Sequence, residues 1–101
     1  CTSVADQAVL WGEDFAPGLD GCAGDCWGQP QCTVHCLQSL SLSGRCAQCY
    51  GAAVACSQTT CRPDCSWDAK SEACRKCTGA RCFPDLSACA GATVPHASPG
   101  G

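Results

Sequence analysis

Two pairs of cysteines have the spacing that zinc sites use. Two residues separate Cys46 from Cys49, two separate Cys74 from Cys77, and 24 residues lie between the pairs. Two such pairs supply four thiolates, which can bind Zn²⁺ tetrahedrally as in a zinc ribbon. A zinc site built from these four thiols is therefore one chemistry that the spacing indicates.

The second of these pairs also has features of a thiol–disulfide exchange site. Arg75 and Lys76 lie between Cys74 and Cys77, and positive charge favours the reactive thiolate. No strand–helix pattern of the thioredoxin kind precedes the motif, however. Redox chemistry therefore stands beside zinc binding as an alternative to a structural role.

The number of cysteines favours the structural role. Cysteine makes up 14 of 101 residues, which is typical of a disulfide scaffold. Because the count is even, every thiol can be paired, and we expect about seven disulfides, no bound metal and no cofactor. The spacing leaves the connectivity open. The cysteines concerned are Cys1, Cys22, Cys26, Cys32, Cys36, Cys46, Cys49, Cys56, Cys61, Cys65, Cys74, Cys77, Cys82 and Cys89.

No pattern indicates another kind of catalysis, so we expect the chain not to be an enzyme. A Gly-x-Ser-x-Gly motif is absent. Of the two histidines, His35 lies between two cysteines and His96 lies in the C-terminal stretch. The adjacent carboxylates of Glu13 and Asp14 would diverge on a helix.

The charges are distributed unevenly along the chain. Residues 1–44 contain five acidic residues and no Lys or Arg, whereas the remainder contains six basic and four acidic residues. Nucleic-acid binding would require a concentrated basic surface, so we expect no nucleic-acid partner. No apolar run approaches the roughly 18 residues of a membrane-spanning helix, so we expect no transmembrane segment.

Cysteine usage also indicates the compartment. Disulfides form in oxidising surroundings, so we expect a lumenal or extracellular protein whose leader, ahead of Cys1, was removed. Cys1 could instead carry a lipid, as in a lipoprotein. That alternative would leave an odd number of thiols, so we favour pairing of Cys1.

Residues 1–21, which precede most of the cysteines, are predicted to form an amphipathic helical arm. Thr2 or Ser3 could cap a helix there, and Pro17-Gly18 would end it. One face of this helix either packs on the core or, exposed, docks on a partner. Four apolar residues recur on that face at helical spacing: Val4, Ala8, Trp11 and Phe15.

Residues 22–91 form the expected disulfide-rich core of short helices and loops. Spacings of three and four place neighbouring cysteines on one side of a helix, from which they link it to another segment. Cys49-Tyr50 and Cys56 align with Cys82-Phe83 and Cys89 at an offset of 33 residues, which indicates two degenerate modules, 22–57 and 61–91. Residues 92–101 have the composition of a flexible tail.

The segment from Cys74 to Gly91 resembles cysteine-rich helical modules of secreted and lumenal proteins of algae and other protists. Its Cys-x2-Cys-x4-Cys-Phe run and later Cys-Ala-Gly carry the resemblance. Such small proteins are similar to accessory subunits on the lumenal face of dinoflagellate-type photosystem complexes. The resemblance implies a thylakoid-lumen location and supplies no catalytic residues.

We therefore expect a non-enzymatic accessory protein that docks on a larger membrane-associated or extracellular assembly. Large aromatic side chains contribute most to such contacts. The alternatives are a free secreted effector, toxin or inhibitor and, in a third class, a zinc or thiol-redox protein. The expected contact residues are Trp11 and Phe15 on the arm. Trp27 and Trp67 are lesser candidates, and for these two we favour packing against disulfides.

Overall fold

The computed structural model describes residues 1–27, 29–65 and 71–95, and every regular element in these ranges is a helix. This confirms the expected small, disulfide-rich helical fold. The helices are α1 (Val4–Leu10), α2 (Phe15–Cys26), α3 (Pro30–Gln38), α4 (Gly44–Thr59), α5 (Arg62–Cys65), α6 (Glu72–Arg81) and α7 (Phe83–Ala90).

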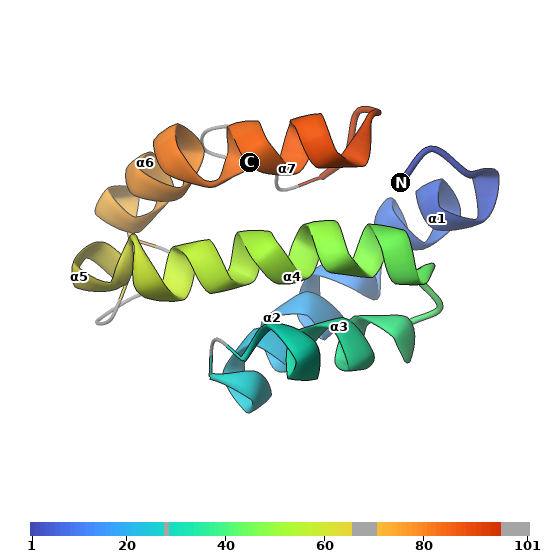
Figure 1. The fold of residues 1–101 in the computed structure, drawn as a ribbon, viewed down its shortest axis with the longest axis horizontal. Helices are drawn as coiled ribbons and strands as arrows, with labels where there is room; N and C mark the ends of the chain where they lie inside the picture. Colours follow the sequence, from blue (N-terminus) through green and yellow to red (C-terminus); the bar gives the residue numbers. More distant parts are fainter. Residues whose placement is uncertain (28, 66–70, 96–101) are drawn as a thin grey trace.

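Helix α4 is the centre of the fold. It lies between α2 and α3 on one side and α6 and α7 on the other, with α1 beside its N-terminal end (Figure 1). Ser43 is its N-cap, because the Ser43 hydroxyl accepts the N–H of Cys46 at 3.3 Å. The helices on both sides of α4 therefore pack on the same central helix.

The disulfides occur mostly as nested pairs. In each nested pair, two cysteines of one segment bond in reverse order to two of the next, which is what antiparallel helices require. Neighbouring cysteines thus link their helix to another segment, as predicted. The nested pairs are Cys22–Cys36 with Cys26–Cys32, Cys61–Cys77 with Cys65–Cys74, and Cys49–Cys89 with Cys56–Cys82, and Cys1–Cys46 is the seventh bridge.

The internal repeat has a simpler physical meaning in the structure. Cys49 and Cys56 on α4 bond to Cys89 and Cys82 of the α7 region. The aligned cysteines are the two sides of one antiparallel contact. Because both bridges join residues 22–57 to 61–91, the two predicted modules share a single covalently linked core.

Aromatic and aliphatic side chains fill the space around α4. The rings of Phe15 and Tyr50 meet edge to face, with centroids 5.1 Å apart. Tyr50 donates its hydroxyl hydrogen to the carbonyl of Pro95 at 2.6 Å, and Val94 is buried. The first residues of the predicted tail therefore pack on the core, and residues 96–101 lie outside the described ranges.

A glycine sets the close approach of α3 to α4. A Cβ at Gly51 would lie 2.9 Å from Cγ2 of Val34, inside normal contact distance. Helix α3 itself begins at Pro30, whose fixed φ and missing N–H suit the first position of a helix. Small size at Gly51 thus determines how the two helices pack.

The prediction of one continuous helix through the N-terminal arm is wrong. Ser3 caps α1 as expected, since its hydroxyl accepts the N–H of Asp6 at 3.0 Å. The helix stops at Leu10, and a new helix begins at Phe15 after a turn. Pro17 lies in the first turn of α2, where its missing N–H costs little, so it does not end the helix. The predicted boundary after residue 21 falls inside α2.

Candidate docking surface

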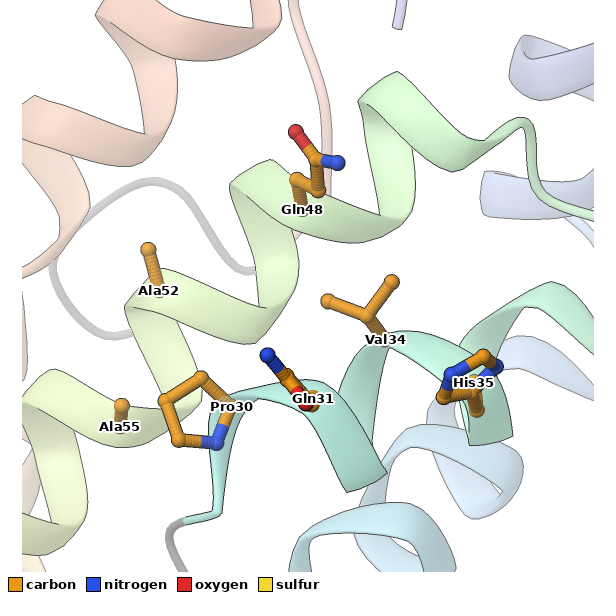
Figure 2. A pocket seen from close by; sticks show the side chains of 7 residues that line it. All are labelled: Pro30, Gln31, Val34, His35, Gln48, Ala52 and Ala55. Carbon is orange, nitrogen blue, oxygen red and sulfur yellow. The ribbon is translucent and has the colours of Figure 1, made fainter.

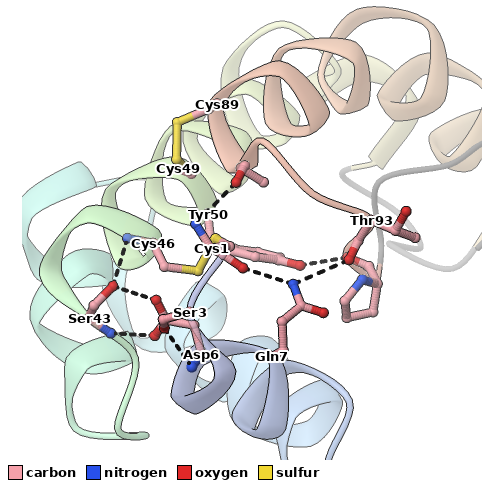
Figure 3. Close-up of a disulfide and its surroundings, with 12 residues drawn as sticks. Cys1, Ser3, Asp6, Gln7, Ser43, Cys46, Cys49, Tyr50, Cys89 and Thr93 are labelled. Carbon is pink, nitrogen blue, oxygen red and sulfur yellow. Dashed lines mark hydrogen bonds between the residues drawn. A yellow bond between two sulfur atoms is a disulfide. The ribbon is translucent and has the colours of Figure 1, made fainter.

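The N-terminal arm is held rigidly against α4. Cys1 forms a disulfide with Cys46, and the Gln7 side-chain amide donates to the carbonyls of Cys1 at 2.8 Å and Thr93 at 3.4 Å (Figure 3). The sulfur of Cys1 is therefore occupied by Cys46, which removes the thioether-lipid alternative. These contacts fix the orientation of α1.

Asp6 is a second anchor of α1. Its carboxylate is buried and accepts the backbone N–H of Ser43 at 2.8 Å and the Ser43 hydroxyl at 2.6 Å. Burial raises the pKa of Asp6, but the hydrogen bonds from Ser43 outweigh it, so the pKa lies below its ordinary value. The negative charge also lies at the N-terminus of α4, where the helix dipole favours it.

The outward face of α1 is apolar. Val4 is 87% exposed and Trp11 is 58% exposed, and Ala8 between them is also exposed. The indole N–H of Trp11 donates to Oε1 of Gln7 at 2.9 Å, which orients the ring. Three of the four residues of the predicted face are thus exposed on the surface of the described part of the chain.

Phe15 is the exception, and its assignment as a contact residue is corrected. The chain turns after α1, so Phe15 starts α2 instead of extending the α1 face, and its ring is 3% exposed. It packs on Tyr50 in the core. Trp67, another expected contact residue, lies outside the described residues.

Trp27 is exposed at the other end of α2. Its side chain is 86% exposed, and its backbone is left-handed, with φ of 49°, at the C-terminal end of the helix. That conformation favours glycine and disfavours a bulky side chain. Trp11 lies at the end of α1, whereas Trp27 lies at the end of α2, a helix of 12 residues that is about 18 Å long.

A separate apolar groove of about 510 Å³ runs between α3 and α4, opened by the small residues of α4. Figure 2 shows Val34 beside this groove on α3, facing the backbone of α4. Its lining residues are Pro30, Gln31, Val34, His35, Gln48, Ala52 and Ala55.

Zinc binding and thiol–disulfide exchange both require free thiols, and the structure has none among its cysteines. All fourteen cysteines lie in the described ranges and all are bonded in pairs. Cys46 and Cys49 bond to different partners, as do Cys74 and Cys77. Within the part of the chain that the structure describes, no group of His, Cys, Asp and Glu is placed to hold a metal ion.

Comparison with protein-family models, with curated proteins and with solved structures found no match for this chain. Among the described residues, no helix has the length and apolar character needed to cross a membrane. The seven disulfides fit an oxidising environment.

The prediction that Trp27 packs against a disulfide is wrong, because its side chain lies in the solvent. The signal was present in the sequence: Trp27 directly follows Cys26 and precedes Gly28 and Pro30, so it falls where one helix must end before the next begins. Only the backbone shows that the left-handed position went to the tryptophan.

Proposed function

We propose that this chain is a non-enzymatic accessory protein that docks on a larger protein assembly through the outward face of α1 and through Trp27. The observation that carries the proposal is Trp27. Its side chain is almost fully exposed, and its backbone conformation disfavours it, so it contributes little to folding. Contact with a partner would explain why a tryptophan occupies this exposed, strained position.

The rest of the exposed apolar surface supports the same function. Among the described residues, the exposed large hydrophobic side chains are Val4, Trp11 and Trp27, all within the first 27 residues. Large aromatic side chains with few rotatable bonds contribute strongly to interfaces when a partner covers them. The disulfides and hydrogen bonds that hold α1 preorganise this surface, which lowers the entropic cost of docking.

The proposed location is an oxidising lumen or the extracellular space. The most specific form of the proposal follows from the resemblance of residues 74–91: a lumenal accessory subunit of an algal photosystem supercomplex. The free effector or inhibitor remains the competing function, since the same scaffold would serve it.

Native size measurement tests this proposal. Extracts from the source cells, prepared without reductant, are separated by native size-exclusion chromatography, and the tagged chain is followed. The wild type should elute with a large assembly, whereas Trp27→Gly and Trp11→Ala should elute as monomers. Circular dichroism of the purified variants should show that both are folded. Gln48→Ala, in the α3–α4 groove, is the matched control and should elute as the wild type does.

Two results would overturn the proposal. A wild type that elutes as a monomer from native extracts would favour the free effector. Variants at Trp11 and Trp27 that remain in the assembly, with Gln48→Ala displaced from it, would move the docking surface to the groove.

A further inference from the structure

A hollow of about 370 Å³ lies between the turn after α1 and the chain that joins α3 to α4. Its floor includes the partly buried side chains of Val9 and Leu40 and the ring of Phe15, whereas its rim includes two acidic side chains. The residues that line it are Ala8, Val9, Gly12, Glu13, Asp14, Phe15, Ser39, Leu40 and Ser41.

The shape of this hollow depends on a close approach at its floor. A Cβ at Gly18 would lie 2.8 Å from Cδ1 of Leu40, so the glycine lets Leu40 lie close against α2 in this position. Ser41, on the rim, has a positive φ of 80°, a strained conformation for a serine. The hollow is thus formed by specific backbone positions in three segments.

The two carboxylates at the rim are unpaired. Glu13 and Asp14 are exposed, Asp14 makes no capping hydrogen bond from its side chain, and neither carboxylate has an ion-pair partner among the described residues. The nearest basic residue before or after them in the sequence is Arg45. The N-terminus of α2 beside Asp14 offsets part of this negative charge, and both carboxylates remain exposed beside the hollow, where a cation can reach them.

We infer that this hollow receives a long cationic side chain, arginine or lysine, of the docking partner. An aliphatic stem would lie on Val9 and Leu40, and the charged end would reach Glu13 and Asp14. This inference rests on the proposed function and names the chemistry of the partner: a basic segment of a protein.

The experiment uses small probes of that side chain. The isotope-labelled chain, with its disulfides intact, is titrated with capped arginine amide, capped lysine amide and capped citrulline amide, and backbone amide shifts are measured by NMR. Both cationic probes should give saturable shifts confined to residues 8–15 and 39–41, and citrulline, which has nearly the shape of arginine without its charge, should bind at least about tenfold more weakly. The difference between arginine and lysine shows whether the planar guanidinium is preferred.

Two double variants provide the matched comparison. Glu13→Gln with Asp14→Asn should weaken binding of capped arginine about tenfold, whereas Asp64→Asn with Asp85→Asn removes the same charge on α5 and α7 and should leave it unchanged. Equal binding of citrulline, shifts elsewhere on the molecule, or equal effects of the two double variants would overturn the inference.

These outcomes are separable from those of the docking test. Loss of probe binding at the hollow, with the wild type still eluting in a large assembly, would overturn this site and leave the docking function standing. Saturable probe binding by a chain that elutes as a monomer would overturn the docking function and support the hollow as a cation site.

Discussion

Replacing Asp6 by alanine should lower the free energy of unfolding by about 2–3 kcal/mol. The carboxylate accepts two short hydrogen bonds from Ser43, one from the backbone and one from the hydroxyl. Hydrogen bonds to a charged group contribute about 1.5–3 kcal/mol each, so two would sum to about 3–6 kcal/mol. We expect a loss below this sum because water can replace the acceptor at the exposed Ser43.

The assay is guanidinium-induced unfolding with the disulfides intact, followed by circular dichroism. Asp6→Asn keeps the shape but not the charge, and should cost about half as much as Asp6→Ala. A double-mutant cycle with Ser43→Ala should give a coupling energy of about 1 kcal/mol, because the hydroxyl of Ser43 donates directly to the carboxylate.

The pH dependence gives an independent check. The pKa of Asp6 is lower in the folded chain than its ordinary value of 3.8. Its contribution is therefore fully present above that ordinary value, and it is lost as the pH falls through the lowered folded pKa. The wild type should lose its stability advantage over Asp6→Asn across this acidic window.

A loss below about 1 kcal/mol for Asp6→Ala would refute the reasoning, since it is less than one charged hydrogen bond contributes. Additive effects of Asp6→Ala and Ser43→Ala would refute it equally. Either result would mean that the Cys1–Cys46 disulfide and the Gln7 hydrogen bonds hold α1 in place with little contribution from Asp6.

Three further predictions concern packing and covalent links. Gly21→Ala should stabilise α2 by about 0.5–1 kcal/mol, because its new methyl group meets open space. Gly51→Ala should lose that gain, because its methyl group would contact Val34 too closely. Thermal unfolding measures both variants, and equal stabilisation of the two would contradict this prediction. Removing the disulfide with Cys1→Ala and Cys46→Ala should cost about 4 kcal/mol for a loop of 45 residues, measured by guanidinium unfolding, and a cost below about 1 kcal/mol would rule out the loop-entropy explanation. Alkylation of the native chain without reductant should label no cysteine by intact mass, and labelling of four or more would restore the metal or redox alternatives.

Much of the fold could be predicted because the cysteine spacing carries helical periodicity. Pairs such as Cys22 and Cys26 can bridge to a second helix only from one helical face, and the structure links them to Cys36 and Cys32. The predicted apolar face of the arm is present from Val4 to Trp11, but it does not extend to Phe15 as predicted. The chain turns before Phe15, a turn that a spacing of four residues does not reveal.

The docking surface could be predicted only in part. Exposure of Trp11 and burial of Phe15 depend on how α1 and α2 pack, and the same apolar spacing is compatible with either result. The carboxylates of Glu13 and Asp14 were visible in the sequence, but their hollow is completed by Leu40, from a distant segment.

The sequence by itself determined that this chain is a helical, fully disulfide-bonded scaffold, because cysteine number, parity and spacing are local properties of the chain. Connectivity was decided by the tertiary structure, since fourteen chemically identical thiols are distinguished only by which helices lie antiparallel. The tertiary structure also decided the surface. Anchoring of α1 by Asp6 and Cys1 exposes the face that carries Trp11, and the way α2 ends leaves Trp27 in the solvent.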